Sequence, residues 1–387
     1  MQLFLFLGIH LFICMVLQGT KPVVSLYADS LGASAGQIGV LVSAYAIIPM
    51  VLAIKFGKIL DQIGARILTL YGAMGMVVSL ILPIVFPTYF SLLFTQLVMG
   101  ASVICCLISM QKAIGNLDGN RDKLIAMFSL MSSMGEFIGP IQTSYIYEHF
   151  GIQITFGVNV TILAIIICTI LFTPKKLWGK IEPTVQKIKI KETFSLLSNE
   201  NLRKAMIISA MVLSSKDLFV AYFPVYGSDI GLRPSTIGLI ISVSAAAAMF
   251  VRIVQFPLVQ RFGKGRILTA TLMISAICFL LVPFFTNVYL LLLISTVLGL
   301  GLGLGQPLSI VFSMNASVPE RHGEVLGLRL TLNRVSQFSA PFLFGGIGTF
   351  TGVGSLFLFT GASIFIGSFF TRITEGKKKL VEKAESM

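Results

Sequence analysis

The sequence predicts an all-α membrane protein in which twelve transmembrane helices form two pseudo-symmetric six-helix bundles. Three observations predict it: apolar runs recur from end to end, basic residues fall in alternate connections, and the chain repeats itself internally. Hydrophobic types make up 55% of the 387 residues, and charged types only 12%. A soluble domain carries about a quarter charged residues, and a disordered chain combines high charge with low hydrophobicity. The composition therefore argues against a soluble enzyme and excludes disorder.

Each expected helix is an apolar run of about the 20 residues that cross a bilayer. Continuous apolarity excludes a transmembrane β-barrel, whose strands alternate between apolar and polar residues. The first run lacks the basic start and the small-residue cleavage site of a signal peptide, so it counts as a helix. The expected spans are 3–27, 36–58, 66–86, 88–111, 123–147, 153–173, 202–226, 235–258, 266–286, 288–313, 323–348 and 353–372.

The net charge of +13 is distributed as a topology signal. Most Lys and Arg residues fall in or beside alternate connections and the C-terminal tail, whereas the opposite connections hold only Arg233. Cytoplasmic loops carry such an excess of basic residues, so we expect a multi-pass protein of the cell membrane with both termini in the cytoplasm. Basic segments next to the bilayer also attract anionic lipid, and no nucleic-acid partner is needed to explain the charge.

The second half of the chain repeats the first. Tyr27 and the residues after it match Tyr226 and its followers, 199 residues later, and after a two-residue slip Pro140 falls over Pro341. Parallel repeats related by an axis along the membrane normal occur in one large class of transporters, with the substrate site between the halves near mid-membrane. The expected organisation is an N-terminal bundle, a cytoplasmic linker and a C-terminal bundle with a basic tail, over 1–173, 174–201 and 202–387.

The connection after the second span carries Gly57, Asp61, Gly64 and Arg66. Glycines allow two helix ends to approach closely, and a carboxylate is favoured at a neighbouring helix N-terminus. The pattern resembles the signature loop of the major facilitator superfamily. That resemblance implies the twelve-helix fold of the family and a conformational latch formed by these four residues. The matching position of the second half has Gln260 in place of the aspartate.

A second motif lies on the fifth span, where Gly135, Gly139 and Pro140 occur together. It is similar to the motif that marks antiporters and drug exporters of the same superfamily. Small residues four apart also allow close packing of any two helices, which is the alternative interpretation. Proton-coupled exporters of the family carry an arginine a few residues before a glycine of the fourth span, but here Gln96 stands before Gly100.

Ionisable residues inside the expected spans are the candidates for function. Charges at membrane depth cost several kcal/mol, so they usually face a cavity and work there. Glu136 and Asp217 fall near mid-membrane and are the candidates for proton exchange. The alternative is a set of ion pairs, such as Asp217 with Arg334, that only join helices. Candidates for substrate binding are Lys21, Lys216, Arg252, Arg329, Asn333, Arg334, Gln337 and Gln306.

The expected function is transport of a small organic solute by alternating access, with export driven by proton antiport. The excess of cations over anions within the spans favours an anionic, zwitterionic or amphiphilic substrate. The five cysteines and three histidines show no metal-ligand spacing, so we expect no metal and no cofactor, and no catalytic constellation suggests an enzyme. We expect a monomer. The alternatives are symport or facilitated uptake of an organic anion, a lipid or glycolipid flippase, and a membrane receptor that transports nothing.

Overall fold

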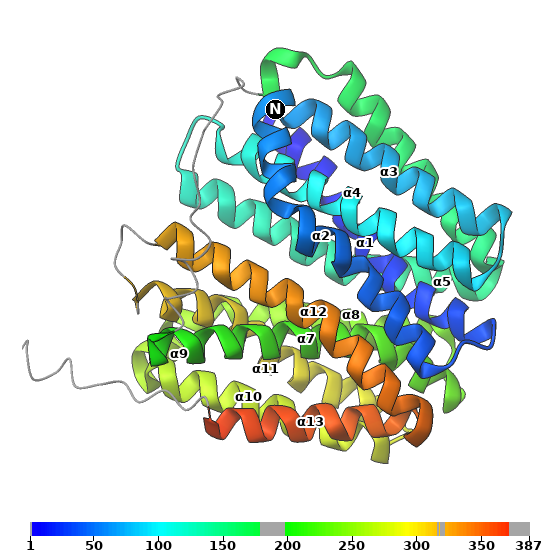
Figure 1. The fold of residues 1–387 in the computed structure, drawn as a ribbon, viewed down its shortest axis with the longest axis vertical. Helices are drawn as coiled ribbons and strands as arrows, with labels where there is room; N and C mark the ends of the chain where they lie inside the picture. The colour runs from blue at the N-terminus through cyan, green and yellow to red at the C-terminus, as the bar shows by residue number, and fades with distance from the viewer. Residues whose placement is uncertain (1, 179–197, 316, 318–321, 371–387) are drawn as a thin grey trace, which may run out of the picture.

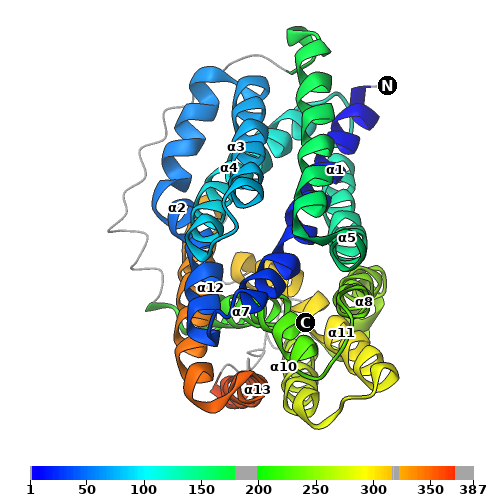
Figure 2. The same cartoon turned by 90° about the vertical axis from the view of Figure 1, so that its right-hand side faces the viewer.

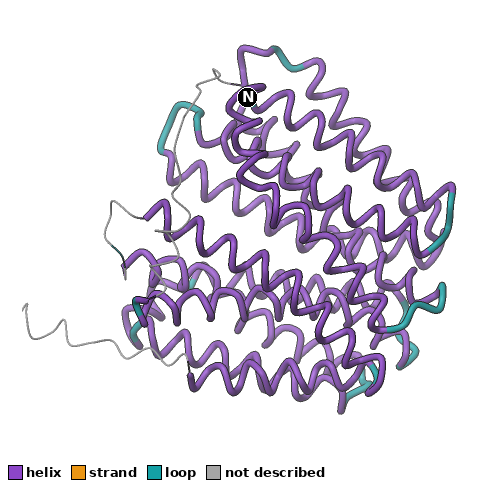
Figure 3. Tube along the Cα trace, viewed as in Figure 1, coloured by secondary structure: helices purple, strands orange, loops and turns teal. Residues whose placement is uncertain are grey.

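The computed structural model describes residues 2–178, 198–315, 317 and 322–370, and within them every regular element is a helix (Figures 1 and 3). Most of the expected linker and all of the tail beyond residue 370 lie outside the described residues. The helices are α1 (Gln2–Ser30), α2 (Ala35–Ile63), α3 (Ala65–Val85), α4 (Tyr89–Gly115), α5 (Arg121–Phe172), η1 (Lys175–Trp178), α7 (Glu200–Asp229), α8 (Pro234–Ile253), α9 (Gln255–Phe262), α10 (Lys264–Leu281), η3 (Val282–Phe284), α11 (Val288–Asn315), α12 (His322–Thr351) and α13 (Val353–Phe370).

The expected all-helical membrane fold is confirmed. Among the described residues, 10 helices are long and apolar enough to cross a bilayer. Helix α5 holds two of the expected spans, which meet at a kink where Gly151 has φ 74°. Helix α12 covers the expected span 323–348 but is not one of the ten, because polar and charged side chains interrupt its apolar run. The expected span 235–258 is broken at Val254, between α8 and α9.

Polar caps and glycines fix where helices begin and end. Ser34 accepts a hydrogen bond from the backbone N–H of Gln37, and the Gln37 side chain accepts one from the backbone of Ser34, so α2 starts with a capping box. Between α2 and α3, Gly64 has φ 81° and ψ 163°, and Gly263 between α9 and α10 has φ 83° and ψ 149°. Residues with a Cβ rarely adopt this backbone conformation. The sharp reversals at both positions therefore require glycine.

Replacing Gly64 by Ala is expected to lower the free energy of unfolding by about 1–3 kcal/mol, because the Cβ is strained at this backbone conformation. Thermal unfolding of the purified protein in detergent measures the change. The control is Gly57→Ala inside α2, where a Cβ would meet nothing within 4 Å. Alanine favours a helix over glycine, so the control should not lose stability. An equal loss in both variants would contradict this account of Gly64. The open space beside Gly57 also means that no other helix approaches it closely, so the expectation of a close helix contact at this glycine is wrong.

The described helices form two groups, which we call the N-terminal half (2–178) and the C-terminal half (198–370). In Figure 1 the helices of both groups run across the view, and Figures 1 and 2 both show the N-terminal half above the C-terminal half. Helix α1 packs against α7, α2 against α12, and α5 against α8 across the boundary. The start of α1 and the end of α13 lie at one end of the bundle, the terminal face. The α1–α2 and α12–α13 connections lie at the other end, the opposite face (Figure 1).

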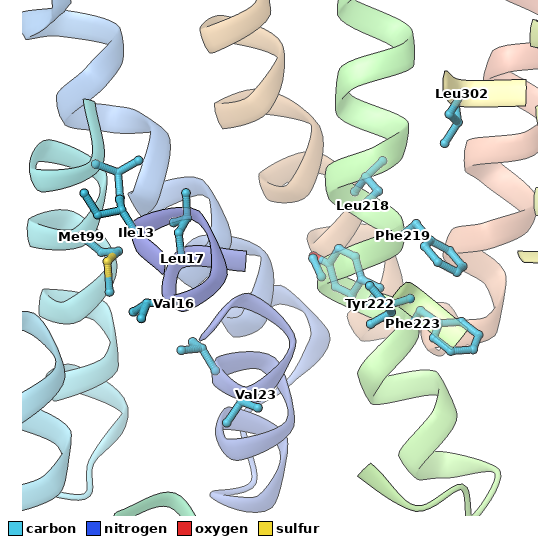
Figure 4. Close-up of a cluster of buried hydrophobic side chains, with 14 of the residues drawn as sticks. Ile13, Val16, Leu17, Val23, Met99, Leu218, Phe219, Tyr222, Phe223 and Leu302 are labelled. Carbon is cyan, nitrogen blue, oxygen red and sulfur yellow. The ribbon is translucent and has the colours of Figure 1, made fainter. Parts of the chain in front are cut away.

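Apolar side chains fill each half. Figure 4 shows Ile13, Val16 and Leu17 of α1 near Met99 of α4, and a row of large side chains along α7 that includes Phe219. All of these side chains are almost completely buried. Because α1 and α7 carry apolar residues on the sides that face their own halves, their polar residues are left for the boundary between the halves. That boundary holds the candidate site.

The two halves are in close contact toward the opposite face. The Tyr222 hydroxyl of α7 donates to the carbonyl oxygen of Ala35 in the N-terminal half at 3.3 Å and to that of Pro341 in its own half at 2.9 Å. The backbone N–H of Gly36 donates to Thr349 Oγ1 at 2.8 Å, so α2 and α12 are joined directly. A Cβ on Gly39 would lie 2.6 Å from the Tyr222 hydroxyl, closer than real Cβ atoms come to such an atom. The bundle is therefore tightly closed on this side of the candidate site.

Candidate functional site

Two ion pairs cross the boundary between the halves near the middle of the helices. Glu136 of α5 accepts a hydrogen bond from Lys216 of α7, with 2.7 Å between Oε2 and Nζ. Asp217 of α7 faces Lys21 of α1, with 3.6 Å between Oδ1 and Nζ. Each half thus provides one carboxylate and one lysine to the other half. The two residues expected to exchange protons lie in one cluster, and each has a basic partner.

The remaining carboxylate oxygens accept hydrogen bonds from glutamine side chains of the same half. Gln18 Nε2 donates to Glu136 Oε1 at 3.1 Å, and Gln337 Nε2 donates to Asp217 Oδ2 at 2.7 Å. Arg334 Nη1 in turn donates to Gln337 Oε1 at 2.7 Å. Both oxygens of both acids therefore have partners, which offsets the cost of withdrawing the carboxylates partly from water. Asp217 is not paired with Arg334, contrary to the alternative considered from the sequence.

A small cavity lies beside these groups. Its lining includes Lys21, Asp217 and Gln337 together with Tyr45 and Gln96, and its volume is about 30 Å³. The Lys21 ammonium also lies over the Tyr45 ring, 5.3 Å from the ring centre. Pockets that enclose drug-sized ligands measure about 300–1,000 Å³. This cavity has room for a few water molecules at most, so a larger solute can enter only when the halves move apart.

Arg252 of α8 makes a further contact between the halves. Its Nη1 donates to Ser133 Oγ of α5 at 3.1 Å, and its Nε donates to the Gly303 carbonyl oxygen at 3.3 Å. Pro307 lies four residues after Gly303 and has no N–H, so this carbonyl lacks its usual partner inside α11. Pro307 of α11 thereby leaves an acceptor free that holds Arg252 at the boundary.

Three of the residues expected to bind substrate lie instead within the C-terminal half. Arg329 is 5% exposed and donates to the Gln306 side chain and to Ser309 Oγ. Asn333 is 4% exposed and accepts a hydrogen bond from Ser209 Oγ at 2.9 Å, while Gln306 Nε2 donates to the Ser209 carbonyl at 2.9 Å. These contacts join α7, α11 and α12. In this conformation the three side chains hold the half together and do not line the cavity.

The loop between α2 and α3 is anchored inside the N-terminal half. Asp61 Oδ1 accepts a hydrogen bond from Lys112 Nζ at 2.6 Å, and Lys112 belongs to the last turn of α4. Arg66 donates to the carbonyl oxygens of Ile170 and Leu171 at the end of α5, at 3.2 and 2.9 Å. The sequence suggested a helix N-terminus as the environment of Asp61, whereas the ion pair described for it is with a basic side chain in the last turn of a helix. Arg66 occupies the C-terminal position that suits a cation.

A family model described as the Major Facilitator Superfamily matches residues 6–256 and 205–386, which together cover almost the entire chain. The chain belongs to the major facilitator superfamily. Membership confirms the expected fold and makes the protein a multi-pass membrane transporter and not an enzyme.

Relatives and solved structures of the superfamily agree with this assignment. The multidrug resistance protein MdtG of Dickeya zeae is 20% identical, with 94% of this chain and 92% of MdtG covered. The quinolone resistance protein NorA of Staphylococcus aureus is 23% identical, with 89% of this chain and 87% of NorA covered. The crystal structure of the nucleoside transporter NupG has a TM-score of 0.79 at 14% identity, covering 96% of this chain and 98% of NupG. The peptide-family transporter PepTSo has a TM-score of 0.77 at 10% identity, covering 100% and 98%.

The motif on the fifth span of this superfamily member lies at crowded helix contacts. A Cβ on Gly135 would lie 2.5 Å from the Cβ of Cys14, and a Cβ on Gly139 would lie 2.8 Å from the backbone nitrogen of Gly19. Both glycines therefore allow α5 to pack tightly on α1. The carbonyl of Pro140 lies against Gly238 of α8, where a Cβ would be 2.5 Å from it. The motif accordingly joins helices within one half and across the boundary.

Gln18 and Tyr45 were not among the candidates expected from the sequence. Both lie next to ionised groups in this transporter, but a neutral glutamine and a tyrosine are ordinary residues at the polar face of a helix. Gln18 lies 199 residues before Asp217, so the internal repeat was the signal that could have identified it. Gln96, which was noted only as the place of a missing arginine, is 6% exposed and lines the cavity.

Proposed function

We propose that this transporter exports a small organic solute across the cell membrane in exchange for protons, with both termini in the cytoplasm. The observation that carries the proposal is the reciprocal pair of ion pairs, Glu136 with Lys216 and Asp217 with Lys21, which join the two halves. The relatives MdtG and NorA are multidrug and quinolone resistance proteins, which supports an export role.

The ion pairs give a physical reason for coupling. A rocking motion of the halves around a midplane site must separate Lys216 from Glu136, or Lys21 from Asp217, because the partners belong to different halves. A carboxylate that loses its cation inside the bilayer is costly, and protonation removes that cost. Separation of the halves therefore favours proton uptake, and re-formation of the pairs favours proton release. The acids link the proton to the conformational change.

The arginines indicate the substrate class. Both lysines are matched by the two carboxylates, whereas the hydrogen bonds described for Arg334 and Arg252 go to neutral oxygens. Arg334 is partly exposed next to the cavity, so its guanidinium can take the anionic group of a solute in a bidentate contact. A cationic group on the same solute would compete with protons for Glu136 and Asp217. A zwitterionic or amphiphilic solute therefore fits proton antiport.

The surplus of arginines also supports a second candidate, symport of an organic anion. A purely anionic solute would bind the lysines as well as Arg334 and would leave the two acids without cations. The acids would then take up protons, so proton and solute would cross together. The two candidates differ in the direction of proton movement that accompanies the solute.

Proteoliposomes with a trapped pH-sensitive dye separate the candidates. A zwitterionic solute added on one side is expected to drive protons in the opposite direction, whereas co-directional movement with organic anions would establish symport and refute antiport.

Arg334→Gln should weaken solute binding by about tenfold or more, since hydrogen bonds to charged groups contribute about 1.5–3 kcal/mol. The matched control is Arg233→Gln, an exposed arginine in the α7–α8 connection, which should bind as wild type does. Unchanged affinity in Arg334→Gln would exclude that arginine from the site.

A further inference from the structure

The internal repeat relates the two carboxylate–amide contacts to each other. Gln18 of α1 and Asp217 of α7 are 199 residues apart, and Glu136 of α5 and Gln337 of α12 are 201 apart, the same two offsets that relate the halves in the sequence. In the N-terminal half the amide lies on the first helix and the acid on the fifth. In the C-terminal half the acid lies on the first helix and the amide on the fifth. The hydrogen bond is the same, with acid and amide exchanged.

A second contact supports this correspondence. His10 Nε2 lies 2.7 Å from Ser132 Oγ in the N-terminal half. Ser209 Oγ donates to Asn333 Oδ1 at 2.9 Å in the C-terminal half. The residues of these two contacts are again 199 and 201 apart. Both halves therefore place polar partners at the same two levels between their first and fifth helices, and the exchanged acid belongs to a repeated structural unit.

We propose that Gln18 and Gln337 are positioning residues that hold the carboxylate of their own half, and that either helix of each pair can supply the acid. The inference rests on the proposed proton coupling. Its chemical basis is that a glutamine side chain both donates and accepts hydrogen bonds, so it can hold a carboxylate through its N–H and a protonated acid through its oxygen. Lysine can only donate. The glutamine therefore keeps its partner through the whole cycle, while the lysine of the other half leaves when the proton arrives.

The geometry fits these roles. Each acid is held by an amide from its own half, at 3.1 Å for Glu136 and 2.7 Å for Asp217. Each lysine comes from the other half. A rigid rocking motion preserves contacts inside a half and changes contacts between halves. Moving the acid from one helix to the other within a half leaves the net charge and the summed side-chain length unchanged, so the cross-half lysine still meets a carboxylate at the same level.

The test exchanges acid and amide within one half at a time. Glu136→Gln alone should lower proton-driven transport at least tenfold, and adding Gln18→Glu should restore it to within about threefold of wild type. The second exchange is Asp217→Asn with Gln337→Glu, so the inference does not depend on one variant folding. A misplaced-acid control combines Glu136→Gln with Ser132→Glu, one helical turn away, and should stay inactive. Thermal stability and membrane yield are compared for all variants.

The outcomes are distinguishable. If Glu136→Gln alone transports normally, the proposed proton coupling fails. If the single variants are inactive and neither exchange restores transport although the proteins fold, the coupling stands and the interchange of acid and amide is refuted. Recovery in the Ser132→Glu control would show that charge alone suffices and would equally refute it. Gln18→Leu gives an independent readout: it removes the hydrogen bond to either form of the acid, and because the bond to the ionised carboxylate is the stronger one, the pH midpoint of transport should rise by about one unit. An unchanged midpoint would remove Gln18 from the positioning role.

Discussion

Replacing Glu136 by Gln and Asp217 by Asn together is expected to reduce proton-driven transport by about a hundredfold, the lower end of what a positioned proton-transfer group contributes. The replacements keep the shape of both side chains and remove the only two acids in the cluster that the described ion pairs define. Without them the halves can still separate, but no proton is gained or lost when they do. Solute flux driven by an imposed pH gradient should disappear, while exchange of labelled for unlabelled solute at equal pH should persist.

Loss of transport must be separated from loss of folding. The double variant leaves Lys21 and Lys216 without counter-ions; breaking a fully buried ion pair costs about 3–5 kcal/mol, and these partly exposed pairs should cost less. Neutralising a whole pair, Glu136→Gln with Lys216→Gln, avoids the unpaired charge and should regain stability without regaining proton coupling. Asp118→Asn changes an exposed acid of the α4–α5 connection and should behave as wild type. Normal proton-driven flux in the double variant would refute the assignment of both acids.

The sequence predicted the positions of the helices more accurately than it predicted where one helix ends and the next begins. Bilayer length and continuous apolarity located most of the membrane-spanning helices, since those properties belong to each segment alone. The kink at Gly151 that joins two spans into α5 and the break at Val254 depend on local backbone conformation and packing, which apolarity does not encode. Helix α12 shows the converse, because its polar residues weaken the apolar signal yet belong to the boundary and interior of the bundle.

The sequence identified the two acids of the candidate site but not the basic residues with which they form ion pairs. Lys216 and Asp217 are neighbours in sequence, yet they bind different partners, since successive residues project about 100° apart around a helix. Lys216 reaches Glu136 and Asp217 meets Lys21. Which charges pair depends on how α1, α5 and α7 pack across the boundary. The burial of Arg329 similarly follows from the packing of α7, α11 and α12, which one helix face cannot reveal.

Adding a single methyl group at Gly345 is expected to oppose closure of the opposite face and to reduce transport by about tenfold or more. A Cβ at Gly345 would collide with the Tyr222 hydroxyl and lie 2.8 Å from the Ala35 carbonyl oxygen of the other half. Overpacking a close contact costs about 1–3 kcal/mol. The Tyr222 contact lies within the C-terminal half, but the Ala35 contact forms only when the halves meet at this face, and its share of the cost shifts the conformational equilibrium by about tenfold toward the state open there. Alanine is otherwise a better helix former than glycine, so the helix itself should not suffer.

The neighbouring residue provides the matched control. Gly346→Ala makes the same chemical change one position along α12, where a Cβ would meet nothing within 4 Å. The conformational shift is measured by the rate at which a membrane-impermeant thiol reagent, added at the opposite face, labels a cysteine introduced at Val42, which lines the cavity. Cys168 is exposed and is replaced by Ser in the background, whereas the other four cysteines are buried. Labelling should accelerate in Gly345→Ala and not in Gly346→Ala. Equal labelling of the two would mean that the glycine contacts between α2, α7 and α12 do not control access to the cavity, and that closure of this face depends on the polar contacts of Tyr222 and Thr349 instead.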